Sequence, residues 1–355
     1  MGLGIDFGYS SLKMIELEKT DQQFTLKNIG LKPIYDDMNR FDPENISKTH
    51  WVSAIQNLST ELNIQTKKIK NAISSLSGSK VSIQQLTTLE MGKEELDQSL
   101  EFEAKKHIPL DGTEAIIDYH IMGQDQNEID KVNVLLVATT KNTVTQHNQI
   151  LLDSGYKSNI YDTDAIALMN CYQHNYEQAD DGADVILNIG NQSSTLVVNG
   201  KSLPFFTREI NISGYHFTKY LVEKNNSDYE TAENFKINNG MENKQLAGSE
   251  DEDTSTADTL NLGIAEKSIL TNLTDEIRKT LRFYVKSNNQ VFFNKFYLSG
   301  GSAMLPGLKE FIAENLNVDV EIFNPFQNIS SDNVVENPPQ YTIAVGLALH
   351  GTEAK

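Results

Sequence analysis

Two stretches of the chain share one pattern, in which an apolar strand ends in a polar residue, a hydrophobic residue and a glycine, and a turn and two further strands follow. The first is interpreted as three short strands, "LGIDFG", "SSLKMIELE" and "FTLKNIGLKPI", and predicts an antiparallel meander. The second, "ADVILNIGNQSSTLVVNGKSLPFFTREINI", begins roughly 180 residues later and repeats this plan. Asp6 and Gly8 of the first copy correspond to Asn188 and Gly190 of the second. A repeat of this length predicts two similar halves that face each other.

The pattern changes between the two copies. A strand over Val81–Leu89 is followed by a charged helix over about 93–107. Two strands, "EAIIDYHIM" and "KVNVLLVAT", then lead to a helix over 142–154. This β-α-β-β-α order predicts a compact subdomain inserted over 81–155.

Helical spacing of apolar residues accounts for most of the other segments. Pro43 is expected to open a helix that carries Ile46, Trp51, Ile55, Leu58 and Leu62. Further helices are expected over 214–224, 229–236, 262–287 and 342–350. The stretch 238–260 is acidic and poor in large apolar residues, and is therefore expected to be a disordered or mobile loop.

Composition narrows the class of protein. A chain of 355 residues with 39% hydrophobic and 22% charged residues should fold into about two domains. The net charge of -19 disfavours binding to nucleic acid or direct adsorption to a membrane. A single cysteine, Cys171, the absence of a signal peptide and the lack of a long apolar run predict a cytoplasmic protein without membrane insertion.

The domain assignment follows from these segments. Residues 1–80, 156–183 and 335–355 are assigned to a first domain, and 81–155 to the inserted subdomain. Residues 184–334, with the acidic loop 238–260, form the second domain.

Three glycine turns follow apolar strands, at Gly8, Gly190 and Gly300–Gly301. Glycine lets the backbone approach a ligand closely, and successive N–H groups in such turns bind anions. Turns from opposite halves could therefore hold the phosphates of ATP from both sides. Asp6, at the end of a buried strand, could hold Mg²⁺ through water, and Lys13 could reach a phosphate. The chain contains no GxxxxGK phosphate loop.

These motifs together resemble the actin–Hsp70–sugar kinase superfamily. "DFGYSSLK" and "NIGNQSST" are similar to its two phosphate motifs, and "YLSGGSAMLPGL" is similar to its adenosine motif. "AENFK" is similar to a segment near the ribose in bacterial actin-like members. The resemblance implies an α/β, actin-like ATPase fold with two ribonuclease-H-like β-β-β-α halves.

Within that superfamily, nearly the whole chain resembles the PilM family of type IV pilus assembly proteins. "EFEAKKHIPL", "IDYHIM", "VLLVATTKNTV" and "YDTDAIAL" are similar to its extra subdomain, which is of the type found in the cell-division protein FtsA. The resemblance implies an ATP-binding scaffold beside the bacterial inner membrane. Its expected partner is the N-terminal cytoplasmic peptide of a PilN-like inner-membrane protein, and a second copy of the chain and pilus motor components are further candidates.

The resemblance also implies a role for particular residues. Asp6 would position Mg²⁺, and Asp6 and Asn188 are the candidates for a catalytic role. The phosphates would be held by Gly8, Ser10, Ser11, Lys13, Gly190, Asn191 and Gln192. The ribose would contact Glu233 and Lys236, and the base would lie against Gly300, Gly301, Ser302 and Met304.

Two positions depart from the superfamily pattern. Asn188 replaces the usual Asp, and an amide can neither accept a proton nor supply the same negative charge. Because positioning and charge supply most of the rate in phosphoryl transfer, ATP binding with weak or no hydrolysis is expected. Tyr9 stands where a smaller residue is common, and could pack over or narrow the cleft.

Other functions remain open at this stage. An FtsA-like division protein or another actin-like scaffold is one alternative, although the final residues, "GLALHGTEAK", carry no basic amphipathic membrane helix. A kinase of sugars or other metabolites is another, but no catalytic base is evident in the sequence. The acidic helix over 94–106 is either a solvated face or part of a partner groove.

Overall fold

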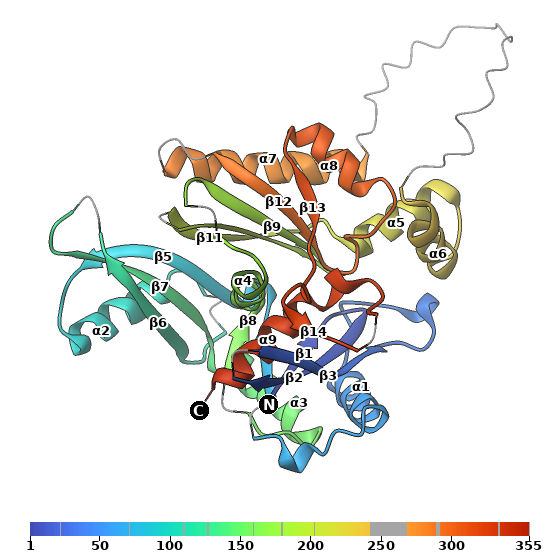
Figure 1. Cartoon of the computed structure of the whole chain (residues 1–355), viewed down its shortest axis with the longest axis horizontal. Coiled ribbons are helices and arrows are strands. Elements are labelled where there is room, and N and C mark those ends of the chain that lie inside the picture. The colour runs from blue at the N-terminus through green and yellow to red at the C-terminus, as the bar shows by residue number, and fades with distance from the viewer. Residues whose placement is uncertain are drawn as a thin grey trace, which may run out of the picture.

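The computed structural model describes residues 1–354 apart from 22, 71, 109–110, 126–127, 159, 179, 202, 242–267, 289–291 and 333. Two sheets with the same strand order form its body (Figure 1). The first runs β3 (Gln23–Pro33), β2 (Ser11–Thr20), β1 (Gly2–Phe7), β4 (Ala72–Leu76), β8 (Tyr161–Thr163), with β14 (Ile329–Ser330) beside β3. The second runs β11 (Leu203–Ile210), β10 (Ser194–Gly200), β9 (Ala183–Ile189), β12 (Phe293–Ser299), β13 (Val320–Ile322).

The repeat predicted from the sequence is therefore the repeat of the fold. In each half, three antiparallel strands form a meander, and its first strand pairs in parallel with the next strand of the sheet. β1 and β9 hold equivalent central places in their sheets, so the glycine turns that follow them lie at corresponding edges.

Side chains alternate between the two faces of each central strand, as the pleat requires. In β9, Val185 and Leu187 point to one core, whereas Ile186 between them belongs to another. In β2, Met14 and Ile15 divide in the same way between two cores. Both faces of both sheets are therefore covered, which explains why β9, with the sequence ADVILNI, is largely apolar along its length.

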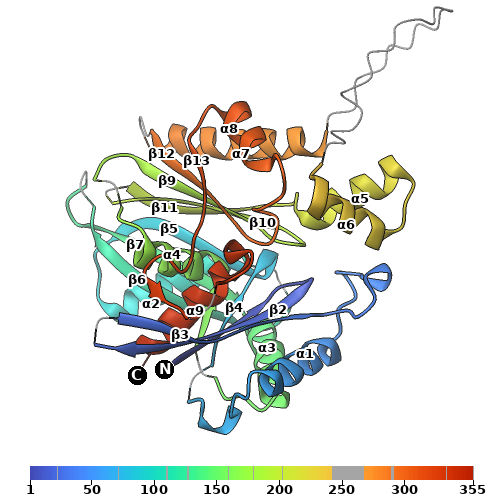
Figure 2. The same ribbon diagram turned by 45° about the vertical axis from the view of Figure 1, so that its right-hand side comes forward.

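Helices cover each face. The outer face of the first sheet packs against α1 (Lys48–Glu61) and α3 (Lys141–Asp153), and that of the second against α7 (Ile269–Ser287) and α8 (Leu308–Leu316). Two inner helices, α4 (Asp164–Asn175) and α9 (Thr342–Glu353), lie between the sheets (Figures 1 and 2). Cys171, predicted to be buried, is enclosed in this inner layer.

The inner helices approach their neighbours through glycine. A Cβ added to Gly4 of β1 would lie 2.2 Å from the carbonyl oxygen of Ala344 in α9. A Cβ added to Gly346 of α9 would lie 1.8 Å from the carbonyl oxygen of Ala167 in α4. No other residue fits at these positions, so the backbones of α4, α9 and β1 are in direct contact.

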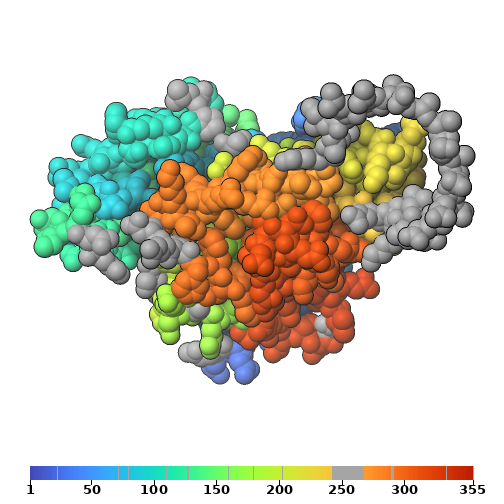
Figure 3. Space-filling view, turned by 90° about the horizontal axis from the view of Figure 1, so that it is seen from above, coloured from blue at the N-terminus to red at the C-terminus, as the bar shows by residue number. Residues whose placement is uncertain are grey.

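A third, antiparallel sheet projects from one side of the body (Figure 3). Its order is β5 (Val81–Leu89), β7 (Lys131–Thr140), β6 (Ala115–Gln124), and α2 (Lys93–Ala104) covers one face. The limits 81–155 predicted for an inserted unit remain a prediction. The last helix within these limits, α3, packs against α1 of the body as well as against β7 of the third sheet.

The second half carries two further helices, α5 (Gly214–Asn225) and α6 (Tyr229–Asn239). A short 3₁₀ turn of the first half, η1 (Met38–Arg40), meets α6. Asn39 Oδ1 accepts a hydrogen bond from the Glu230 amide at 3.1 Å, and Asn39 Nδ2 donates to Glu230 Oε2 at 3.4 Å. The ring of Phe41 packs 5.6 Å from that of Tyr229 and 5.9 Å from that of Tyr215. These contacts, called the clasp below, join the two halves away from the central helices.

Several predicted bounds differ from the structure: α2 ends at Ala104 rather than near 107, α6 at Asn239 rather than at 236, and α9 at Glu353 rather than at 350. The first helix begins at Lys48 rather than at Pro43, because Ser47 and His50 form a capping box there. The described part of the long helix predicted over 262–287 begins at Ile269. Residues 242–260 of the predicted acidic loop lie outside the described residues.

Candidate functional site

The glycine turns of the two halves meet at one cleft. Its walls include Asp6, Gly8, Ser10, Ser11, Lys13, Asn188, Gly190, Asn191, Gln192, Gly300 and Gly301. The cleft has a volume of ≈ 120 Å³. The sequence analysis assigned these eleven residues to one site, and the fold brings them together in one cleft.

The turns leave no space for side chains where they face the cleft. A Cβ on Gly8 would lie 2.7 Å from Lys13 Nζ and 2.7 Å from the Ser11 carbonyl oxygen. A Cβ on Gly190 would lie 2.9 Å from the Ser193 carbonyl oxygen. Glycine is therefore required at both turns, and their backbone can approach a ligand directly.

One ion pair lies on the floor of the cleft. Lys13 Nζ is 3.4 Å from Asp6 Oδ2 and donates a hydrogen bond to the Ser11 carbonyl oxygen at 3.2 Å. Both side chains are buried. Within the described ranges, no group of three or more His, Cys, Asp and Glu residues is arranged to hold a metal ion directly. The water-mediated contact of Asp6 with Mg²⁺ remains a prediction.

Two amide side chains of the second half, those of Asn188 and Asn191, line the same cleft. Asn188 is buried, and its Oδ1 accepts a hydrogen bond from Ser299 Oγ at 3.3 Å. The side-chain oxygen Oδ1 of Asn191 is buried and has no hydrogen-bond partner among the described atoms. Leaving a buried polar atom unpaired costs free energy.

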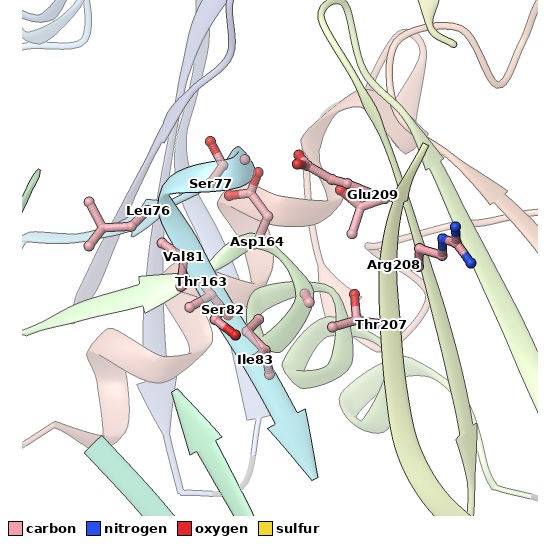
Figure 4. Close-up of a pocket in the computed structure, with 13 residues that line it drawn as sticks. Leu76, Ser77, Val81, Ser82, Ile83, Thr163, Asp164, Thr207, Arg208 and Glu209 are labelled. Atoms are coloured by element: carbon pink, nitrogen blue, oxygen red, sulfur yellow. The ribbon is translucent and has the colours of Figure 1, made fainter. Parts of the chain in front are cut away.

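A second hollow, of ≈ 230 Å³, opens beside the cleft (Figure 4). Ser77 and Asp164 of the first half face Glu209 and Thr207 of β11 across it. Burial and the charge of Asp6 raise the pKa of the Asp164 carboxyl to about 8, against a hydrogen bond from Ser75 Oγ that acts to lower it. Asp164 is therefore largely protonated at neutral pH.

A third hollow, called the large cavity below, has a volume of ≈ 700 Å³. It lies between α1 and α3 on one side and β11 and α5 on the other. Phe7, Tyr9 and Trp51 form an aromatic wall, and His147 lies among them. The pKa of His147 falls to about 4 because the ring is buried. His147 is therefore neutral at physiological pH.

The residues predicted to contact ribose form a closed cluster. Lys236 Nζ is 2.7 Å from Glu233 Oε2, and it donates to Thr218 Oγ1 at 2.8 Å and to the Gly214 carbonyl oxygen at 3.2 Å. Only 3% of the Lys236 side chain is exposed. Burial lowers the pKa of Lys236, and the adjacent Glu233 opposes that effect. Neither residue lines the cleft, so their contact with a ligand remains a prediction.

Only some of the residues predicted to line the base lie at the cleft. Gly300 and Gly301 line the cleft, whereas Ser302 and Met304 do not. Ser302 is buried next to Gly214, where an added Cβ would be 2.8 Å from Ser302 Oγ. Met304 is 53% exposed.

Sequence reasoning missed several residues of the cleft, of which Asp164 is the most important. Asp164 directly follows β8, just as Asp6 and Asn188 lie at the ends of β1 and β9. The available signal in the sequence was a polar residue after a short strand. β8 is placed near β1 only by its pairing with β4, which the sequence does not show.

Known proteins share this architecture. A solved structure described as the PilM-PilN type IV pilus biogenesis complex covers 99% of this chain and 99% of its own, with a TM-score of 0.79 and 23% identity. The ethanolamine utilization protein EutJ from Carboxydothermus hydrogenoformans covers 99% of this chain and 89% of its own, with a TM-score of 0.53 and 11% identity.

The fold and the two-sided cleft define this chain as a protein of the actin-like ATPase fold, as predicted. The sequence profile of the family described as type IV pilus assembly protein PilM matches residues 4–250 and 258–352. The chain belongs to the PilM family. In the described ranges, no helix is both long enough and apolar enough to span a bilayer.

Proposed function

We propose that the protein is a cytoplasmic ATP-binding scaffold of type IV pilus assembly. It would bind the N-terminal cytoplasmic tail of a PilN-like protein and associate with the inner membrane through it, with the nucleotide state modulating this interaction. The observation that supports nucleotide binding best is the convergence of two glycine turns, one from each half, on a single cleft.

The residues of the cleft fit a polyphosphate. The Gly8 and Gly190 turns present backbone at positions where a side chain would clash, and Lys13 supplies positive charge. The cleft, at ≈ 120 Å³, is below the roughly 300–1,000 Å³ of complete small-ligand sites. It is therefore suited to the phosphates, and the adenosine would lie beyond it, toward Gly301 and the Glu233–Lys236 cluster.

The same residues argue for slow hydrolysis. Bound Mg²⁺ would neutralise phosphate charge, and Asp6 would orient its water shell. Asn188 cannot supply a carboxylate on the opposite side, and its Oδ1 is already engaged by Ser299. Protonated Asp164 can donate a hydrogen bond but cannot accept a proton from water.

For the partner, membership of the PilM family and the likeness to the solved PilM-PilN complex support a PilN-like tail. The charged helix predicted as a possible groove face contains i,i+3 and i,i+4 ion pairs, Lys93–Asp97, Lys105–Glu101 and Lys106–Glu103. Such local pairing favours a solvated face. Charge reversal at Glu94 and Glu95 should then leave binding of the tail peptide unchanged.

The test of the proposed function is to measure both ligands on one preparation. Purified protein is incubated with labelled Mg-ATP, and the retained nucleotide is identified over hours. Binding of a PilN-like tail peptide is then measured with ATP, with ADP and without nucleotide. Retained ATP and a nucleotide-dependent peptide affinity would support the proposal. Failure to retain nucleotide would remove its nucleotide part, and failure to bind the peptide would remove its partner part.

The variant Asn188→Asp tests the cause of slow turnover. It restores a carboxylate opposite Asp6 in the cleft, so single-turnover hydrolysis should rise by about tenfold, which corresponds to about 1.4 kcal/mol of barrier. Asn191→Asp, which adds the same charge in the Gly190 turn that follows β9, is the matched control. An equal rise in both variants, or none in Asn188→Asp, would contradict this explanation.

A further inference from the structure

Tyr9 stands at the boundary between the cleft and the large cavity. The two hollows share Phe7, Tyr9, Ser77, Gln192 and Ser193. Of these, Phe7 and Tyr9 are the two large side chains that could fill a passage between them.

Phe7 is held away from the passage. Its ring lies 5.4 Å from that of Trp51 and 4.6 Å from that of His147, so it packs toward α1 and α3. It belongs to the apolar core on that face of the sheet. This leaves Tyr9 as the side chain that separates the two spaces.

Two further observations locate the Tyr9 side chain. Its ring lies edge-on to Trp51, at 6.3 Å and 80°. Burial, together with the nearby carboxyls of Asp164 and Glu209, raises the pKa of the Tyr9 hydroxyl. Asp164 lines the cleft and the second hollow, whereas Glu209 lines the second hollow and the large cavity, so Tyr9 lies where the three spaces adjoin.

We infer that Tyr9 is a partition that closes the phosphate cleft to the water and small molecules of the large cavity. This inference rests on the proposed nucleotide site, since it assigns Tyr9 the role of shielding the terminal phosphate. Hydrolysis forms a bond from a water oxygen to the terminal phosphorus and breaks the bond to ADP, so it requires access of water to that phosphate. Tyr9 thus favours retention of intact ATP, independently of Asn188.

A pair of variants separates the ring from the hydroxyl. Tyr9→Phe keeps the partition, and Tyr9→Ser opens it. Since the chain has one tryptophan, Trp51, its fluorescence reports on the cavity wall without any nucleotide. Quenching of Trp51 by acrylamide should increase in Tyr9→Ser and remain at the wild-type level in Tyr9→Phe.

The second measurement is release of phosphate from bound Mg-ATP in a single turnover. Tyr9→Ser should release phosphate about tenfold faster than wild type, and Tyr9→Phe should stay within about twofold. Wild-type rates of quenching and release in Tyr9→Ser would overturn the inference. If no variant retains nucleotide, the proposed function fails, and the quenching result alone supports or rejects the partition.

Discussion

At Asp164, burial and a hydrogen bond act on one carboxyl in opposite directions. Burial and the charge of Asp6 raise its pKa to about 8, and the hydrogen bond from Ser75 only partly compensates. In the unfolded chain this carboxyl ionises near its ordinary value of about 3.9. Between these two pH values the folded state binds more protons than the unfolded state. The contribution of Asp164 to stability must therefore fall as pH rises from about 4 to about 8.

The variant Asp164→Asn tests this dependence. It keeps an acceptor for Ser75 but cannot ionise, so its free energy of unfolding should match wild type near pH 4, where the loss of stability begins. At pH 8.5 it should exceed wild type by about 2 kcal/mol, a value that allows for the access of solvent to this carboxyl. Urea unfolding at both pH values measures the difference. A difference that does not change with pH would contradict the assigned pKa.

Single residues differ in how far sequence could predict them. Asp6, Gly8 and Lys13 lie within one contiguous motif, so a short stretch of sequence predicts their proximity. Asp164 and Glu209 come from segments separated by the whole of α4, β9 and β10. Their approach depends on the packing of two halves, which no local pattern contains.

Among the elements, type was predictable where the periodicity was long. β5 has the predicted bounds Val81–Leu89, because alternation continues through the strand and Gly92 ends the segment before α2. The start of α1 was missed because its cap uses His50 as the reciprocal partner, whereas the usual capping box has Glu or Gln there. Pro43 is a weaker indication of a helix start than the capping box at Ser47 and His50.

The last helix is tied to the first sheet by a titratable contact. His350 Nδ1 in α9 lies 2.9 Å from Asp162 Oδ2 in β8, and this hydrogen bond raises the pKa of His350. A raised histidine pKa stabilises the fold below the unfolded value and loses this effect as pH rises through the folded value.

The variant His350→Gln should therefore lower the free energy of unfolding at pH 5.5, by about 0.5 kcal/mol for this partly exposed pair. At pH 8.5 its effect should be smaller. His174→Gln is the control, because burial lowers the pKa of His174 and its dependence on pH has the opposite sign. Thermal unfolding at the two pH values distinguishes the variants, and parallel curves for both would contradict the assignment.

For the whole molecule, the sequence repeat predicted two halves, and the strand orders confirm it. The clasp could not be predicted. Asn39 lies in the single 3₁₀ turn η1 and Phe41 follows it directly. Their partners Glu230, Tyr215 and Tyr229 are far along the chain, as in the 191-residue separation of Asn39 and Glu230. Contacts between such segments follow from the closure of the halves and leave no periodic trace.

The clasp gives a prediction for ligand exchange. Phe41→Ala removes the ring contacts that hold the halves together, so bound Mg-ATP should dissociate about tenfold faster, equivalent to about 1.4 kcal/mol. Phe283→Ala, at a half-exposed position on α7, is the control. Hydrogen exchange at the Glu230 amide gives a second readout, since Asn39→Ala removes its acceptor. If neither the dissociation of Mg-ATP nor the hydrogen exchange at the Glu230 amide changes, the clasp does not restrain the separation of the two halves.

The glycine contact of α4 and α9 fixes the spacing of the two sheets. These helices lie between the sheets, and their backbones touch at Gly346 and Ala167 with no side chain interposed. A larger residue at position 346 would push α9 away from α4, because an added Cβ would meet the backbone of Ala167. The distance between the two halves of the molecule therefore depends on the absence of one methyl group.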